Sequence, residues 1–234
     1  MRRPRARAAP LGAPILVVNL KAYPTAVGAG ALRIGRSLER EAKRAGVAVA
    51  IAPAAADLAW LAHRLSIPVL AQHADPADLG ASTGAMVPAS LRASGVHGSL
   101  VNHSEHPLPP RTVDRTVAKL SGVGLTAIVC AGDVRAAARL ARSHPPYLAI
   151  EPPELIGGDR AVSTARPEVV SQAVDRVHRV SPATHVLCGA GVHDRHDVAI
   201  ARWLGSDGIL VASAVTTAPE PARAIRELLR GFGR

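Results

Sequence analysis

Three polar residues that could do chemistry stand just past apolar runs of this sequence. Lys21 follows ILVVN, His103 follows GSLVN, and Glu151 follows YLAI. A lysine brings a compact positive charge to a phosphate or a developing oxyanion. A histidine can polarise a carbonyl or move a proton, and burial raises the pKa of a carboxyl group, which suits a general base. The three residue types therefore favour acid–base chemistry on an anionic ligand.

Each of the three also has a plainer interpretation. Lys21 could be a surface lysine, although lysine is rare here, with three lysines against 25 arginines. His103 could be a structural histidine before the helix-capping pair Ser104-Glu105, and Glu151 could form an ion pair at a neighbouring strand end. No two of the ten histidines join a carboxylate at the helical spacing of a metal site, so we expect no metal ion.

Small residues end two later apolar runs. Residues 188–191 read CGAG, and Ala212 precedes Ser213. Small side chains let a ligand approach backbone N–H groups, and phosphate sites in barrels often use the loops after strands seven and eight. The segment 152–164, PPELIGGDRAVST, has prolines at one end and two glycines at its tip, which fits either a hinged lid or an ordinary exposed loop.

The elements that must position these residues alternate along the chain. Most runs are apolar throughout rather than at every second residue, as in parallel strands covered on both faces. We predict strands at 15–19, 47–52, 67–72, 98–102, 124–129, 147–151, 184–188 and 207–212. Apolar residues at helical spacing predict helices at 28–45, 54–64, 110–121, 133–143, 167–180 and 194–204, and a last helix around Ile225 and Leu228.

This alternation predicts an α/β protein, a single (β/α)8 barrel with its chemistry at the carboxyl ends of the strands. An open doubly wound sheet is the alternative. No Gly-x-Gly-x-x-Gly follows the first strand, which weakens the dinucleotide-binding version of that sheet. We expect one barrel domain over residues 13–234, preceded by a short, disordered, basic leader over residues 1–12.

The composition excludes several classes of protein. Of the 234 residues, 48% are hydrophobic and 20% are charged, which excludes a disordered chain. No apolar run approaches the roughly 20 residues of a membrane helix. Cys130 and Cys188 follow apolar runs and are expected to be buried at strand ends, which favours a reduced, cytoplasmic setting.

The net charge of +10 could suggest nucleic-acid binding. Four of these charges are arginines within the first ten residues, and the other charged residues are dispersed. The five aromatic residues are far apart, so we expect no platform for stacking bases and no nucleic-acid partner. Arg2-Arg3 resembles a twin-arginine export signal, but no apolar segment of the required length follows it.

Together these segments resemble triosephosphate isomerases, most closely the short archaeal-type form. The resemblance runs from about residue 14 to residue 230, and its segments occur in the family's order. They are NLK at 19–21, AQHADPADLGASTG at 71–84, NHSE at 102–105, EPPELIG at 151–157, CGAG at 188–191 and LGSDGILVAS at 204–213.

The resemblance implies interconversion of dihydroxyacetone phosphate and glyceraldehyde 3-phosphate through an enediol(ate), with no metal or organic cofactor. By the family's established pattern, Glu151 would be the base that moves the carbon-bound proton, and His103 would polarise the carbonyl as a neutral imidazole. Lys21 would counter the negative charge of the substrate, and Asn19 would position the substrate oxygens. Glu105 would contact these residues without touching the substrate.

The same resemblance implies a phosphate site and an assembly. Backbone amides would hold the phosphate at Ile156, Gly157, Gly191, Ala212 and Ser213. The protein would be a homodimer or homotetramer, in which the loop 72–84, Thr83 included, reaches a neighbouring subunit.

Two departures from the family's pattern bear on the choice of substrate. Asp159 ends a Gly-Gly-Asp lid tip where the family has Gly-Thr-Gly, and it puts negative charge near the expected phosphate. His106-Pro107 follow NHSE, where family members often have basic or amide residues. The alternatives are therefore an isomerase of a longer phosphosugar, such as a tetrulose phosphate, or a catalytically silent paralogue that binds a sugar phosphate.

Overall fold

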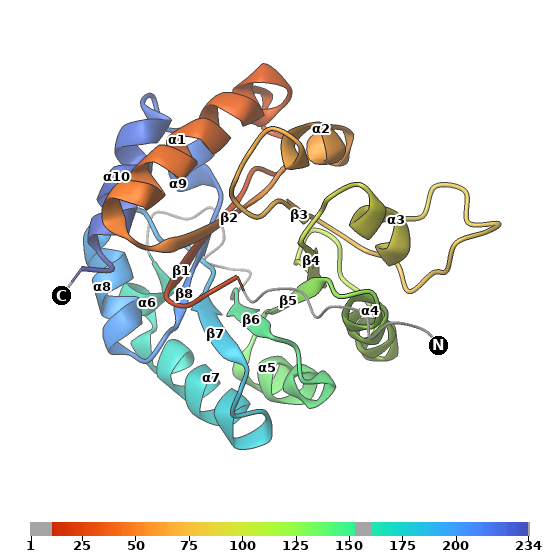
Figure 1. Cartoon of the computed structure of the whole chain (residues 1–234). Coiled ribbons are helices and arrows are strands. Elements are labelled where there is room, and N and C mark those ends of the chain that lie inside the picture. Colours follow the sequence, from red (N-terminus) through yellow and green to blue (C-terminus); the bar gives the residue numbers. More distant parts are fainter. Residues whose placement is uncertain (1–10, 153–160, 234) are drawn as a thin grey trace.

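The computed structural model describes residues 11–152 and 161–233. Within these ranges eight parallel strands form one sheet in the order β2-β1-β8-β7-β6-β5-β4-β3. The strands are β1 (Ile15–Asn19), β2 (Ala48–Ala52), β3 (Leu70–Ala71), β4 (Gly98–Val101), β5 (Thr126–Ala131), β6 (Tyr147–Ile150), β7 (His185–Cys188) and β8 (Gly208–Val211). Helices surround the sheet on its outer side (Figure 1). The (β/α)8 barrel predicted from the sequence is confirmed.

The two ends of the sheet meet and close the barrel. Ile51 of β2 forms a parallel bridge with Val69, and its N–H donates to the carbonyl oxygen of Pro68 at 3.0 Å. β3 is shorter than the predicted strand 67–72, because Pro68 has no N–H to give to a ladder. The closure between β2 and β3 is therefore made by fewer hydrogen bonds than the pairing of β1 with β2.

The helices that return the chain between strands agree with the apolar spacing. The predicted helices correspond to α1 (Ala29–Ala45), η2 and α2 (Ala55–Asp57 and Leu58–Ala62), α4 (Pro110–Gly122), α5 and η3 (Val134–Leu140 and Ala141–Ser143), α7 (Pro167–Val180), α8 (Arg195–Trp203) and α10 (Pro221–Arg230). The sequence analysis missed the short elements η1 (Pro24–Ala26), α3 (Pro88–Ala93), α6 (Val162–Ala165) and α9 (Ser213–Thr216). These have one or two turns, which is too few for a period of 3.6 residues to show.

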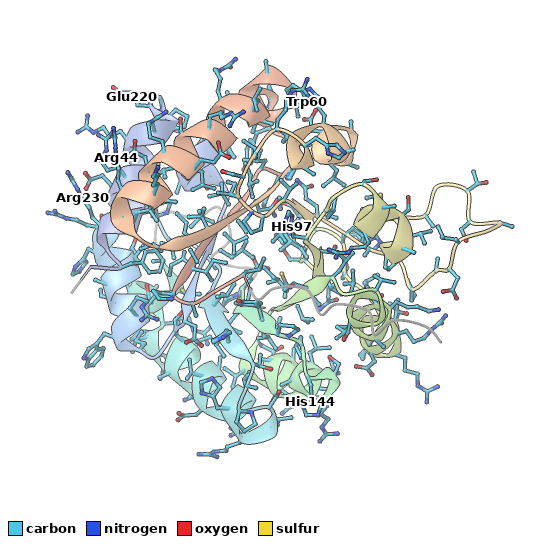
Figure 2. The ribbon with its side chains drawn as sticks, in the orientation of Figure 1. Arg44, Trp60, His97, His144, Glu220 and Arg230 are labelled. Carbon is cyan, nitrogen blue, oxygen red and sulfur yellow. The ribbon has the colours of Figure 1, made fainter. Side chains whose placement is uncertain are left out.

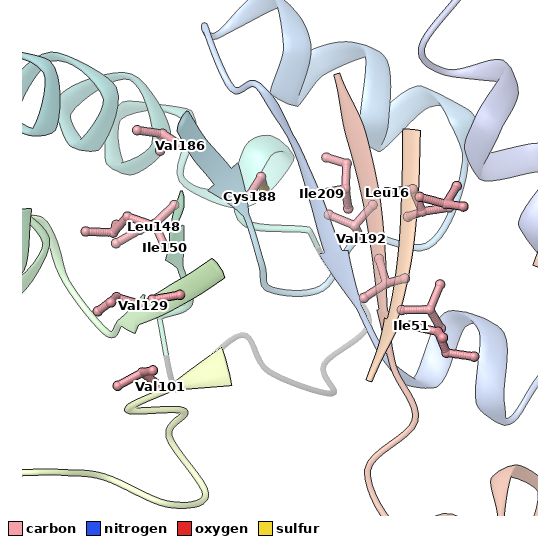
Figure 3. Packing of buried hydrophobic residues seen from close by; sticks show 14 of the residues in the cluster. Leu16, Ile51, Val101, Val129, Leu148, Ile150, Val186, Cys188, Val192 and Ile209 are labelled. Atoms are coloured by element: carbon pink, nitrogen blue, oxygen red, sulfur yellow. The ribbon is translucent and has the colours of Figure 1, made fainter. Parts of the chain in front are cut away.

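The core has two layers that share the strands. Alternate strand residues point to opposite sides, so Ile15 and Val17 of β1 join a cluster inside the barrel with Leu100 and Ile128. Leu16 lies on the other side of β1 and belongs to the larger cluster between the strands and the helices (Figure 3). The barrel interior is thus filled with apolar side chains below the carboxyl ends of the strands.

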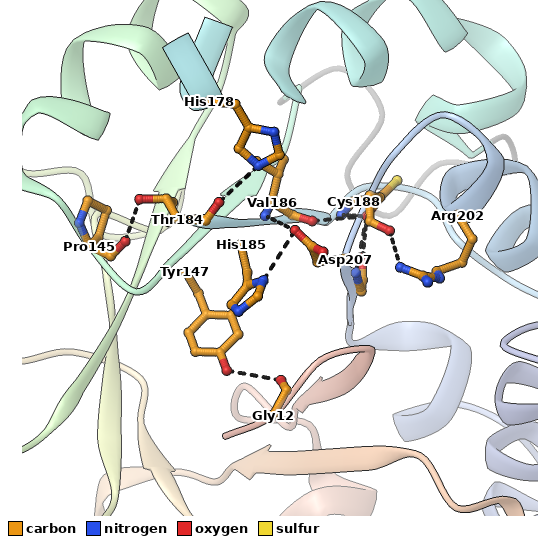
Figure 4. A network of polar contacts seen from close by, with 12 residues as sticks. Gly12, Pro145, Tyr147, His178, Thr184, His185, Val186, Cys188, Arg202 and Asp207 are labelled. Atoms are coloured by element: carbon orange, nitrogen blue, oxygen red, sulfur yellow. Dashed lines mark hydrogen bonds and ion pairs between the residues drawn. The ribbon is translucent and has the colours of Figure 1, made fainter. Parts of the chain in front are cut away.

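A polar network lies at the amino-terminal end of the barrel (Figure 4). The Tyr147 hydroxyl donates to the carbonyl oxygen of Gly12 at 2.9 Å. His185 Nδ1 lies 3.4 Å from Asp207 Oδ2, and the Val186 N–H donates to the same oxygen at 3.1 Å. The Tyr147 hydrogen bond holds the segment before β1 at the end of the barrel that is opposite to the expected site, and the contacts of Asp207 join β7 to the residue before β8.

The first described residues already pack against the barrel. Leu11 is buried, although the sequence analysis placed residues 11 and 12 in the leader. Residues 1–10 lie outside the described part of the chain, so the division into a leader and a barrel domain stays a prediction. Cys130 and Cys188 are both buried and unpaired, as expected. Among the described helices, none has the length and apolar character needed to cross a membrane.

The first and last helices are joined by one buried carboxylate. Glu41 of α1 is 2% exposed, and its oxygens lie 3.0 Å from Arg226 of α10 and 3.0 Å from Arg44. The hydrogen bond from Arg226 is the main reason that the pKa of Glu41 falls to about 2. The Arg44 side chain itself lies on the outer surface, as do Glu220 and Arg230 (Figure 2).

A glycine of β8 that lies against β1 gives a test of the fold. A Cβ on Gly208 would lie 2.2 Å from the carbonyl oxygen of Ile15, so Gly208→Ala must push β8 away from β1. We expect this substitution to lower the free energy of unfolding by about 1–3 kcal/mol in urea. Gly122→Ala, at the end of α4, is the matched control because its Cβ would meet no atom within 4 Å. Equal stability of the two variants would contradict the described register.

Candidate active site

One pocket at the carboxyl ends of the strands brings most of the predicted site residues together. Its lining includes Asn19, Lys21, His103, Glu151, Gly191, Ala212 and Ser213. Glu105 lines a neighbouring pocket that shares Asn19, Lys21 and His103 with the first. Ile156, Gly157 and Asp159 lie outside the described residues, so their predicted places at the phosphate stay predictions.

His103 is held by the turn that follows β4. Asn102 has φ 63°, and its side chain accepts from the Leu108 N–H and donates to the Cys130 carbonyl oxygen, both at 2.8 Å. The Glu105 N–H donates to His103 Nδ1 at 3.2 Å, so this nitrogen is an acceptor. A neutral imidazole with an accepting Nδ1 carries its proton on Nε2. His103 Nε2 lies 3.7 Å from Glu151 Oε1.

The surroundings of His103 keep it neutral. The side chain is 8% exposed, and burial is the main cause that lowers its pKa. The positive charge of Lys21 lowers the pKa further, and the negative charge of Glu105 opposes this. His103 is therefore a neutral donor at physiological pH, which is the state that the resemblance implied.

Glu151 directly follows β6 and is a buried carboxyl group. Its side chain is 4% exposed, and its Oε2 atom has no hydrogen-bond partner among the described residues. Burial raises the pKa of Glu151 to about 7, although a hydrogen bond with the Cys130 thiol and the charge of Lys21 oppose the rise. A carboxyl group with this pKa is ionised in part at neutral pH and can both take and return a proton.

The place of Glu151 depends on a glycine that the sequence analysis assigned to a different role. A Cβ on Gly189 would lie 2.5 Å from Glu151 Cγ, so the glutamate side chain rests on the bare backbone of this glycine. In the sequence, CGAG suggested only close approach of a phosphate. The feature that could have identified Gly189 is its position directly after β7. Because Cys188 pairs with Ile150, Gly189 lies in register with Glu151.

Lys21 is fixed by two neighbours of its backbone. Its φ is 48°, its N–H donates to Asn19 Oδ1 at 3.0 Å, and its carbonyl oxygen accepts from Gln72 Nε2 at 2.9 Å. Its ammonium lies 2.6 Å from Glu105 Oε1. Asn19 and Gln72 thus place the lysine, while Glu105 pairs with its charge. Gln72 was missed, because only its tertiary contact with Lys21 reveals it.

A small-residue wall of the pocket is formed by Gly191, Ala212 and Ser213. Gly191 has φ 66°, and Ala212 precedes the short helix α9, whose first residue is Ser213. This wall offers backbone close to a ligand, as the sequence analysis expected for a phosphate. Over the described residues, no group of three or more His, Cys, Asp or Glu side chains is placed to hold a metal ion.

The raised pKa of Glu151 predicts a specific effect on stability. In the folded protein the pKa of Glu151 is about 7, whereas the usual pKa of a glutamate is 4.5. Ionisation of Glu151 is therefore harder in the folded state than in the unfolded state and lowers the free energy of unfolding. This loss of stability develops as the pH rises from 4.5 to about 7 and is constant at higher pH. We therefore expect Glu151→Gln to raise the midpoint of thermal unfolding by several degrees at pH about 8.5 and by much less at pH about 5.

Glu168→Gln is the control for this measurement, because Glu168 is an exposed carboxylate on α7. Its substitution should have the same small effect at both pH values. If the difference in midpoint between Glu151→Gln and the unmodified protein were the same at both pH values, Glu151 would not be a buried carboxyl group with a raised pKa.

Comparisons of this chain with known proteins all match it to triosephosphate isomerases. The family model described as triosephosphate isomerase matches residues 14–228. The triosephosphate isomerase of Methanobacterium bryantii is 38% identical over 216 residues, covering 92% of this chain and 96% of the relative. That of Cenarchaeum symbiosum is 42% identical over 219 residues, covering 94% and 98%.

A solved structure supports the fold independently. The crystal structure of triosephosphate isomerase from Bartonella henselae matches with a TM-score of 0.77 and 18% sequence identity, covering 94% of this chain and 99% of that one. At this identity the match concerns the barrel alone. The family model and the archaeal relatives span nearly the whole chain, and the chain therefore belongs to the triosephosphate isomerase family.

Proposed function

We propose that this protein is an isomerase that interconverts dihydroxyacetone phosphate and D-glyceraldehyde 3-phosphate. The observation that carries the proposal is the pair of His103 Nε2 and Glu151 Oε1, 3.7 Å apart in one pocket. One group is a neutral hydrogen-bond donor and the other a carboxyl group with a pKa of about 7. Membership of the triosephosphate isomerase family supports this choice of reaction over a longer phosphosugar or a silent binding protein.

The chemistry needs only these side chains. The Glu151 carboxylate removes a proton from the carbon beside the carbonyl, and the C–H electron pair forms the double bond of an enediolate. The His103 Nε2–H donates to the carbonyl oxygen as negative charge develops there. Glu151 then returns the proton to the neighbouring carbon, while the hydroxyl proton moves between the two oxygens. No atom is gained or lost, and no cofactor takes part.

The remaining residues bind the substrate in this proposal. The Lys21 ammonium faces the negative charge of the substrate, and Asn19 holds both the lysine and the substrate oxygens. Glu105 keeps the His103 proton on Nε2 through its backbone N–H. The phosphate binds at the small-residue wall and the lid, at Ile156, Gly157, Gly191, Ala212 and Ser213.

The proposed partner is a second copy of the same chain, in a homodimer or a homotetramer. The loop between β3 and α3 extends away from the barrel (Figure 1), and Leu79 in it is 71% exposed. A large apolar side chain on an extended loop supports contact with another protein surface. We also propose a cytoplasmic location, which the two buried, unpaired cysteines support. We propose no nucleic-acid partner.

Glu151→Gln tests the reaction and the assigned base together. The amide keeps the shape of the side chain but cannot accept the carbon-bound proton, so kcat should fall by about 10²–10⁴-fold or more with a much smaller change in KM. The measurement is turnover of glyceraldehyde 3-phosphate, with formation of dihydroxyacetone phosphate followed by a coupled assay. Glu168→Gln, prepared in the same way, should keep full activity, and the turnover that remains in Glu151→Gln gives the upper limit for contaminating isomerase.

Two other results would contradict this proposal in different ways. Near-full activity of Glu151→Gln would mean that another group is the base. Background turnover in all three proteins would mean that the substrate is different, or that the pocket only binds sugar phosphates.

Sedimentation velocity tests the assembly. We expect the unmodified protein to sediment as a dimer or tetramer. Leu79→Glu should shift the distribution towards smaller species, because a charge would be buried in the contact. Val27→Glu is a control at another exposed apolar residue, distant in sequence from the loop. A monomer at all concentrations for the unmodified protein would remove the proposed assembly.

A further inference from the structure

The acid–base pair comes from two strands that are not neighbours. His103 lies two residues past β4, Glu151 directly follows β6, and β5 lies between these two strands in the sheet. At this end of the barrel β5 is two residues longer than β4, because Val101, the last residue of β4, pairs with Val129. The end of β5 is therefore the common support on which the spacing of His103 and Glu151 depends.

The last two residues of β5 hold both groups through their carbonyl oxygens. The Glu151 N–H donates to the Ala131 carbonyl oxygen at 2.8 Å. The side-chain amide of Asn102 donates to the Cys130 carbonyl oxygen, also at 2.8 Å. The Cys130 thiol in addition forms a hydrogen bond with the Glu151 carboxyl group. Asn102, the residue before His103, is thus the link from β5 to the histidine.

A side chain makes this link because the backbone turns away at Asn102. Its φ of 63° lies in the left-handed region, which glycine and asparagine adopt more readily than other residues. The pairing of β4 with β5 ends one residue earlier, at Val101. Glycine would accept the same φ, but it would leave the Cys130 carbonyl oxygen without the donor that Asn102 provides.

The same side chain closes the turn that carries His103. Asn102 Oδ1 accepts from the Leu108 N–H at 2.8 Å. Residues 107–110 read PLPP, so Leu108 is the one residue of this segment with a backbone N–H to donate. Inside the turn, the Glu105 N–H donates to His103 Nδ1 at 3.2 Å. Loss of Asn102 Oδ1 would release the end of the turn, because the prolines offer no other backbone donor in its place.

We propose that Asn102 is a positioning residue that holds the His103 imidazole opposite Glu151 through both of its side-chain hydrogen bonds. Asn102 is not among the described residues that line the pocket of His103 and Glu151, but it lines a neighbouring pocket together with Cys130 and Glu151. It therefore acts through His103, by keeping the Glu105 N–H on Nδ1 and the imidazole proton on Nε2. The effect on turnover rests on the proposed function, whereas the effect on the imidazole does not.

The ring nitrogens of His103 report on this role without any need for turnover. In ¹⁵N NMR spectra, a ring nitrogen that carries the proton and one that only accepts have well-separated signals. We expect this separation for His103 in the unmodified full chain at pH about 8. Asn102→Gly keeps the positive φ and removes both hydrogen bonds, so the two signals should move towards each other. The signals are assigned by their absence in His103→Gln.

The kinetic consequence is a loss in kcat with little change in KM. Asn102→Gly should lower kcat for glyceraldehyde 3-phosphate about tenfold or more, because displacement of a catalytic group by about 1 Å can cost up to about 100-fold. KM should change less than about twofold, since Lys21 is held by Asn19 and Gln72 and not by Asn102.

His144→Gly is the matched control for the glycine substitution. His144 also has a positive φ, 49°, and its Nδ1 atom lies 3.1 Å from the Ser181 hydroxyl oxygen. It lies before β6, at the end of the barrel opposite to the site. This variant should leave both the His103 signals and kcat unchanged.

Asn102→Asp separates the two hydrogen bonds. A carboxylate still accepts from the Leu108 N–H but cannot donate to the Cys130 carbonyl oxygen. Its His103 signals and its kcat should therefore lie between those of the unmodified protein and those of Asn102→Gly. This variant also decides the question if Asn102→Gly does not fold, which circular dichroism would show.

The outcomes separate this proposal from the proposed function. Unchanged His103 signals in Asn102→Gly overturn it, as does a similar displacement of these signals in His144→Gly. Displaced signals with full kcat also overturn it, because His103 would then not need to be held. If Asn102→Gly does not fold, an Asn102→Asp variant identical to the unmodified protein in signals and kcat overturns it. If the unmodified protein does not turn over the triose phosphate, the proposed function fails and the signals alone decide on Asn102.

Discussion

The site depends on a carboxyl group that is buried without a full set of partners. Glu151 is almost inaccessible and one of its oxygens has no hydrogen bond in the described structure. Such a group costs stability, and a fold keeps it only where the surroundings hold it firmly. Here the apolar layers of the barrel lie beneath it, and Gly189 provides the space for its side chain. The raised pKa, which suits the proposed role of Glu151 as a base, results mainly from that burial.

The closed barrel explains which residues reach the pocket. Side chains alternate between the interior and the exterior along each strand, so the position two residues past the last interior apolar side chain also points inward. Val17 is followed in this way by Asn19, and Ala149 by Glu151. Any change of register would move these polar groups to the outside. Helix contacts such as Glu41 with Arg226 stabilise the ring that keeps the register.

The strands and the residues that follow them show how much of the fold and of the site could be predicted from the sequence. Eight apolar runs were enough for the strands, and a carboxylate directly after YLAI was enough to suggest a base. The proton position on His103 could not be predicted, because it depends on a backbone N–H donated by Glu105. Gln72 could not be predicted either, since it acts by a tertiary contact. The lid residues Ile156 and Gly157 are assigned by resemblance alone.

Lys21 links the two halves of the acid–base pair. Its positive charge lowers the pKa of His103 and also lowers that of Glu151. Both effects suit the proposed roles, in which the electrophile is a neutral imidazole and the base is ionised. Glu105 has the opposite effect on both groups and pairs with the lysine at 2.6 Å. The Lys21–Glu105 pair therefore adjusts the pKa values of His103 and Glu151, which burial shifts most, and a change at either member would move both pKa values in the same direction.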